Sequence, residues 1–167
     1  MKVGKKIALC GLFTALALIS FLLENLVPPL FVPGAKMGIS NAFILLALIF
    51  LGAPYGFITL ILKCVLGSIF SGNISAILYS LPSGLISLTA EYLLLRFTKN
   101  VSVVAISVAG AVINSCVQNA IFSLVTESLF AFTYLPYLAS IGTVGGIAVG
   151  LIVFFIIKAM PEGYKGG

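Results

Sequence analysis

The sequence predicts an all-α integral membrane protein with six membrane-spanning helices and both ends in the cytoplasm. Hydrophobic residues make up 61% of the 167 residues and charged residues only 8%, whereas a soluble domain carries about 25% charged residues. Six apolar segments follow one another between Pro, Gly and polar breakers. Most basic residues fall on one side of the membrane that these segments define, which fixes the expected orientation.

The expected helices cover residues 7–26, 39–51, 55–70, 74–95, 101–125 and 134–159, within a single integral membrane domain of residues 1–167. A span needs about 20 apolar residues, so the second segment must tilt or thin the bilayer locally. A five-span arrangement, in which this segment re-enters the membrane, is the alternative. Pro82 and Gly84 are expected to kink the fourth helix. The first segment lacks a small-residue cleavage site and is expected to stay as a helix.

Charge decides between the two arrangements. With six spans and the N-terminus inside, seven of the nine basic residues lie on the cytoplasmic side: Lys2, Lys5, Lys6, Arg96, Lys99, Lys158 and Lys165. Lys36 lies outside, and Lys63 lies within a span. Basic residues favour cytoplasmic loops, and a five-span arrangement would move Lys158 and Lys165 outside. We therefore predict a multi-pass protein of the bacterial cytoplasmic (inner) membrane.

The residues that are absent exclude several classes of function. The chain has no His and no Asp, and its carboxylates are Glu24, Glu91, Glu127 and Glu162. It has no imidazole base, no His-ligated metal, no ATP-binding glycine loop and no paired aspartates to hold magnesium and diphosphate. We predict no enzyme activity, no catalytic residue, no metal and no cofactor. The basic residues mark topology and not a nucleic-acid partner, and the isolated cysteines are expected to pack as small apolar residues.

The outer loop at residues 28–41 holds three prolines, two glycines and one cation, Lys36. A stiff apolar loop of this kind is typical of a lid over a binding pocket, and the alternative is a plain connector. Asn41 at its end either contacts a ligand or, with Ser40, caps the second helix.

Lys63 lies near the middle of the third span, where a charge costs a few kcal/mol and normally faces the bundle interior. Three interpretations stay open from the sequence. Lys63 forms a buried pair with Glu91, it faces a polar cavity and attracts an anionic group, or its side chain snorkels to the inner interface.

Amides and small residues mark two further helices. Asn114 and Gln118 are four residues apart and share a face of the fifth helix, where they either bond other helices or line a cavity. In the first helix, Gly11 and Ala15 form a small-xxx-small pair that permits close approach of another helix. The glycines of the sixth helix predict close internal packing.

Three segments carry a resemblance to a bacterial family. These are PGAKMGISN at 33–41, LKCVLG at 62–67 and GAVINSCVQ at 110–118. The chain resembles the Gx transporter family, also called heptaprenyl diphosphate synthase component I, over most of its length. That family looks like the substrate-binding S components of energy-coupling factor (ECF) transporters, which implies a six-helix bundle with a pocket near the outer face. The resemblance implies Lys36, Asn41, Lys63 and Gln118 near the pocket. It also implies Ala8, Gly11 and Ala15 at a face that docks onto a transmembrane coupling subunit driven by ATPases.

Two functions follow as hypotheses. The first is a membrane subunit that binds a small, anionic, vitamin-like or quinone-precursor molecule for uptake, with Lys36, Asn41, Lys63, Asn114 and Gln118 in its site and an ATPase module as partner. The second is a non-catalytic accessory subunit of prenyl diphosphate or quinone biosynthesis that binds an isoprenoid lipid.

Overall fold

Helices form all regular structure in the described part of the chain. The computed structural model describes residues 3–26, 38–98, 101–127 and 129–160. The elements are α1 (Val3–Leu26), α2 (Ser40–Leu51), α3 (Ala53–Phe70), the short 3₁₀ helix η1 (Ile74–Ala76), α4 (Ile77–Phe97), α5 (Val103–Val125), the 3₁₀ helix η2 (Leu129–Tyr134) and α6 (Leu135–Ala159). The predicted all-α membrane bundle of six helices is therefore confirmed, and each helix begins and ends within a few residues of its predicted bounds.

Five of the six helices are long and apolar enough to cross a membrane, and α2 is the exception. Its 12 residues span about 18 Å at ~1.5 Å per residue, whereas the hydrocarbon core is about 30 Å thick. The sequence prediction that this segment is too short for an ordinary crossing is confirmed.

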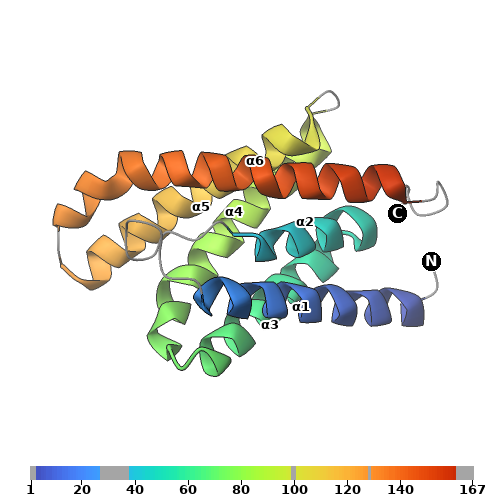
Figure 1. The fold of residues 1–167 in the computed structure, drawn as a ribbon, viewed down its shortest axis with the longest axis horizontal. Helices are drawn as coiled ribbons and strands as arrows, with labels where there is room; N and C mark the ends of the chain where they lie inside the picture. Colours follow the sequence, from blue (N-terminus) through green and yellow to red (C-terminus); the bar gives the residue numbers. More distant parts are fainter. Residues whose placement is uncertain (1–2, 27–37, 99–100, 128, 161–167) are drawn as a thin grey trace.

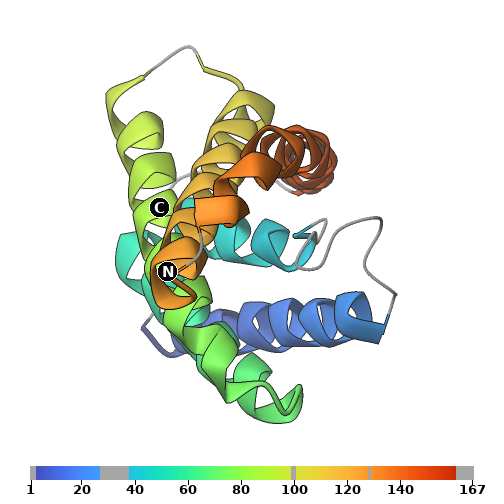
Figure 2. The ribbon, with the colours of Figure 1, turned by 90° about the vertical axis from the view of Figure 1, so that its left-hand side faces the viewer.

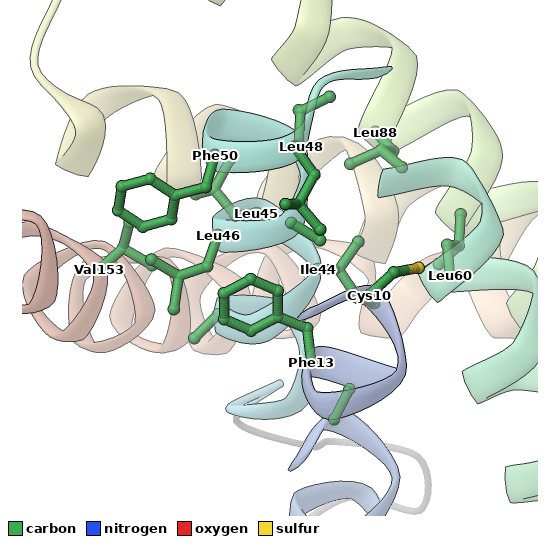
Figure 3. Close-up of a cluster of buried hydrophobic side chains, with 14 of the residues drawn as sticks. Cys10, Phe13, Ile44, Leu45, Leu46, Leu48, Phe50, Leu60, Leu88 and Val153 are labelled. Atoms are coloured by element: carbon green, nitrogen blue, oxygen red, sulfur yellow. The ribbon is translucent and has the colours of Figure 1, made fainter. Parts of the chain in front are cut away.

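Helix α2 lies in the centre of the bundle, between α1 and α6, and also packs on α3 (Figures 1 and 2). Nine of its residues are buried: Ser40, Ala42, Ile44, Leu45, Leu46, Ala47, Leu48, Phe50 and Leu51. The apolar side chains among them meet Phe13 of α1, Leu60 of α3 and Val153 of α6 in the main hydrophobic cluster (Figure 3). Other helices of the bundle surround α2, and a helix that is buried in this way is apolar on all sides.

The chain reverses direction from one helix to the next, so the first turn of α1 and the last turn of α6 lie at the same end of the bundle (Figure 1). Lys5 and Lys6 begin α1, Arg96 lies in the last turn of α4, and Lys158 lies in the last turn of α6. Four basic residues of the described chain thus gather at one end. That this end faces the cytoplasm stays a prediction.

Helix α6 packs on α5 through glycines spaced four residues apart. A Cβ atom on Gly146 would lie 2.7 Å from Cα of Val108, and one on Gly150 would lie 2.6 Å from Cα of Val104. The two backbones therefore approach too closely for any side chain at these positions. The predicted close packing of the sixth helix is confirmed.

The bundle consists of two packed halves. Helices α1, α2 and α3 contact one another, and α5 packs on both α4 and α6. The halves meet mainly where α3 packs on α4 and where α2 packs on α6. The junction between these halves is the setting of the site described below.

Local caps explain some helix ends and correct one prediction. Ser102 caps α5 by accepting a hydrogen bond from the Ala105 amide (3.2 Å). The expected capping of α2 by Ser40 or Asn41 is wrong, because its N-cap residue is Ile39 and no side chain caps it. Instead, the Glu24 carboxylate accepts a hydrogen bond from the Ile39 amide (2.7 Å) and ties the end of α1 to the start of α2. Cys10 and Cys64 are buried, in line with the expected packing as small apolar residues, and Cys116 is half-buried.

Replacing Gly150 with Ala should destabilise the protein by about 1–3 kcal/mol, because the added methyl group forces α5 and α6 apart. Gly11→Ala is the matched control, since nothing lies within 4 Å of a Cβ atom there. Thermal unfolding of both variants in the same detergent measures the effect. A Gly150→Ala protein as stable as the Gly11→Ala protein would show that the helices do not pack this closely.

Candidate functional site

A small cavity of about 40 Å³ lies at the junction of the two halves. It is lined from α2, α3, α4, α5 and α6, and the polar side chains among its lining residues are Asn41, Ser87, Glu91, Ser107 and Asn114. The rest of the lining is apolar or glycine, including Ile44, Leu60 and Gly146. A polar chamber of this kind inside a bundle of membrane helices is expensive to maintain and points to a function.

The wall from α4 and α5 is built around Gly110. The Ser87 hydroxyl donates a hydrogen bond to the Gly110 carbonyl oxygen (2.8 Å). One turn later on the same face of α4, the Glu91 carboxyl group lies directly against Gly110, where a Cβ atom would overlap with Oε1 of Glu91. Because residues four apart share a helix face, Ser87 and Glu91 reach α5 together, and the missing side chain at Gly110 gives the carboxyl group its room.

Glu91 is only 8% exposed and, among the described residues, is the single carboxylate in the cavity wall. The hydrogen bond at this helix crossing comes from Ser87 and goes to backbone, and no group in the described ranges donates one to the Glu91 carboxyl. Every fully enclosed side-chain nitrogen or oxygen of the described residues does have a hydrogen-bond partner. The carboxyl group therefore faces the open space of the cavity, where a water molecule or an ion reaches it.

Lys63 lies on a different surface of α3. It is 9% exposed, and its ammonium nitrogen lies 5.0 Å from the centroid of the Phe21 ring on α1. Within the described part of the chain no ion pair joins Lys63 to Glu91, which corrects the interpretation of these two residues as a buried pair. The face of an aromatic ring stabilises a cation. The Phe21 ring is therefore the group that stabilises the buried ammonium group of Lys63.

The structure brings together two of the five predicted ligand residues. Asn41 and Asn114 both line the cavity, from the start of α2 and the middle of α5. Gln118 is half-buried one turn beyond Asn114 and is not part of the cavity wall. Lys63 is likewise absent from the wall, although it lies three residues along α3 from Leu60, which belongs to it. Lys36 and the other lid residues from 28 to 37 fall outside the described residues.

A sequence model of the family described as heptaprenyl diphosphate synthase component I matches residues 13–156. The chain belongs to this family. The match runs from α1 to α6 and so includes every residue of the cavity wall. No curated protein and no solved structure matches the chain. The family description names one component of a synthase, and it assigns no ligand or site residue to the membrane bundle.

The predicted docking residues lie on the outside of this family member. Ala8, Gly11 and Ala15 are exposed on one face of α1, and the surface over Gly11 is open. Their opposite neighbours on the helix, Phe13 and Ala17, are buried against the rest of the bundle. The face is therefore available to a partner, and docking itself stays a prediction.

Sequence reasoning missed the roles of Ser87, Glu91 and Ser107. Glu91 was considered only as a partner for Lys63, and the two serines were not considered. Their signal in the sequence is the four-residue spacing of Ser87 and Glu91 on α4, which places two polar groups on one face of a membrane helix. The glycine that receives them, Gly110, is recognisable only once α4 and α5 are placed side by side.

Gly110→Ala should destabilise the protein by about 1–3 kcal/mol, because the added methyl group collides with the Glu91 carboxyl group. The double variant Gly110→Ala/Glu91→Ala keeps the new methyl group but removes the carboxyl group with which it collides, so it should recover part of this loss. Thermal unfolding of the wild type, both single variants and the double variant measures the coupling. Strictly additive effects would contradict the contact between Glu91 and Gly110.

Proposed function

We propose that this chain is the substrate-binding membrane subunit of an uptake system, similar to the S components of ECF transporters. The observation that carries the proposal is the cavity lined by Asn41, Glu91 and Asn114 at the junction of two helical halves. Amide and carboxyl groups in a membrane bundle are costly unless they bond to other helices or bind a ligand. Here they converge from three different helices on one space.

The cavity is the closed form of the proposed site. Its volume of about 40 Å³ is far below the roughly 300 Å³ that a small-molecule pocket needs. Substrate binding therefore requires the two halves to separate, and their junction depends mainly on two helix contacts, α3 with α4 and α2 with α6. Rigid halves that rock about a central site are a common basis of alternating access in transporters.

The proposed substrate is a small, anionic molecule of the vitamin or quinone-precursor class. Lys63 supports this, because its charge is buried without a carboxylate partner in the described ranges. It lies one turn from Leu60 on α3, so a cavity that widens along α3 reaches it. Asn41 and Asn114 supply hydrogen bonds to the polar part of the substrate, and Gln118 and Lys36 extend the site toward the outer face.

The proposed partner is a transmembrane coupling subunit with its ATPase subunits in the bacterial inner membrane. The chain has no nucleotide-binding loop of its own. The exposed small residues Ala8, Gly11 and Ala15 allow another helix to approach α1 closely. In this proposal the end of the bundle that carries Lys5, Lys6, Arg96 and Lys158 faces the cytoplasm, where basic residues are favoured.

Ligand binding to the purified protein tests the proposal. A panel of vitamins and quinone precursors is screened by thermal shift and by native mass spectrometry. We expect at least one anionic compound to bind, and we expect Asn114→Ala to weaken it about 10-fold or more, as loss of a hydrogen bond to a charged group does. Asn25→Ala, at the exposed end of α1, is the control. A panel without a binder would count against uptake.

Co-purification tests the partner. When the chain is co-expressed with the coupling and ATPase subunits of the same bacterium, we expect Gly11→Leu to reduce their recovery at least 10-fold, because a large side chain blocks close helix approach. Ala105→Leu, on an exposed position of α5, should leave recovery unchanged. Equal recovery with Gly11→Leu would exclude this face of α1 as the docking surface.

The family description favours a second candidate, a non-catalytic membrane subunit of prenyl diphosphate or quinone biosynthesis. In that role the chain binds an isoprenoid lipid. Deletion of the gene separates the two candidates. An accessory role predicts changed prenyl chain length and quinone levels, whereas the uptake role predicts that both are normal when the medium supplies no substrate of the system.

A further inference from the structure

We propose that the central cavity binds a single monovalent alkali cation between the Glu91 carboxylate and the side-chain oxygens of Ser107, Asn41 and Asn114. The proposal does not rest on the uptake function, because it requires neither a substrate nor a partner subunit. It rests on the size of the cavity, the charge in its wall and the chemistry of its lining atoms.

The size of the cavity fits an ion. A water molecule needs about 10–15 Å³ of space for its centre in a protein cavity, so about 40 Å³ admits one small ion with one or two waters. An organic molecule does not fit in this closed form. An ion is therefore the ligand that the observed geometry accepts without rearrangement.

The charge in the wall also favours a cation. Glu91 is more than nine-tenths buried. The ammonium group of Lys63 lies against the Phe21 ring and not against this carboxylate. Within the described ranges no cationic side chain lines the cavity. A buried carboxylate without a counter-charge is strongly disfavoured. Either a proton or a bound monovalent cation neutralises a single carboxyl group, and we assign this place to the cation.

The lining atoms select the type of cation. Carboxylate, hydroxyl and amide oxygens are hard ligands that suit alkali and alkaline-earth ions rather than transition metals. Divalent sites usually collect several carboxylates, and no cluster of three or more His, Cys, Asp or Glu side chains occurs in the described chain. The Ser87 hydroxyl donates a hydrogen bond to the Gly110 carbonyl oxygen. The lone pairs of the Ser87 oxygen therefore stay available, and this oxygen is a further ligand for the cation.

The position of the site gives the ion a role. Its ligands come from α2 in the first half and from α4 and α5 in the second half. A cation at this point holds the halves together, and a ligand that binds only one state of a protein stabilises that state. The ion therefore favours the closed bundle.

Thermal unfolding at constant ionic strength tests the site. The purified full-length protein in detergent is titrated with NaCl, with choline chloride making up the ionic strength, and KCl is compared at the highest concentration. We expect Na⁺ to raise the midpoint by several degrees with saturation, and Glu91→Gln to abolish the rise. Glu127→Gln, an exposed carboxylate at the end of α5, is the matched control and should keep it.

Two further measurements keep the proposal testable if Glu91→Gln alters folding. Ser107→Ala removes one oxygen ligand and should raise the Na⁺ concentration at half-saturation several-fold. Equilibrium binding of ²²Na⁺ should show about one site per chain. An effect of K⁺ equal to that of Na⁺ also supports the monovalent site, provided that Glu91→Gln abolishes it. Identical midpoints in Na⁺ and choline, or an unchanged Na⁺ effect in Glu91→Gln, overturn the proposal.

Discussion

The burial of one carboxyl group, that of Glu91, is the constraint on which the centre of this bundle depends. A carboxylate at membrane depth is tolerated only where it faces protein or a polar space. Here α5 supplies the room because Gly110 has no side chain, and the Ser87 hydroxyl donates a hydrogen bond to the backbone carbonyl oxygen of the same glycine. The crossing of α4 and α5 is thereby fixed, and with it the position of Ser107 and Asn114 on the opposite wall.

The short helix α2 closes the same space from the other half. Its 12 residues are too few for an ordinary crossing of the bilayer, and its apolar surface is covered by α1, α3 and α6. Its first turn is held by the bond from the Ile39 amide to Glu24, which brings Asn41 to the cavity. A buried short helix thus delivers a polar side chain to the middle of the bundle without exposing backbone ends to lipid.

The fold was largely predictable from the sequence because lipid imposes strong rules on length, hydropathy and charge. The bounds of the six helices and the glycine packing of α6 followed from these rules. The site was less predictable, since it depends on which helix faces meet. Asn41 and Asn114 were identified as polar groups in apolar surroundings, but the sequence left three interpretations of Lys63 open, and the ion pair with Glu91 is not found among the described residues. Phe21 contacts Lys63, and Gly67 beneath the Phe21 ring permits that contact; neither residue carries a signal of this role in the sequence.

The two buried ionisable groups lie apart, with Glu91 at the cavity and Lys63 against the Phe21 ring. A double-mutant cycle with Glu91→Gln and Lys63→Met, read as free energies of unfolding in mixed micelles, tests this separation most directly. Independent sites predict effects that add to within about 0.5 kcal/mol. A coupling energy of about 3 kcal/mol lies in the range by which breaking a buried ion pair destabilises a protein. It would mean that Glu91 and Lys63 form such a pair, and that the Glu91 carboxylate is not free to act in the cavity wall.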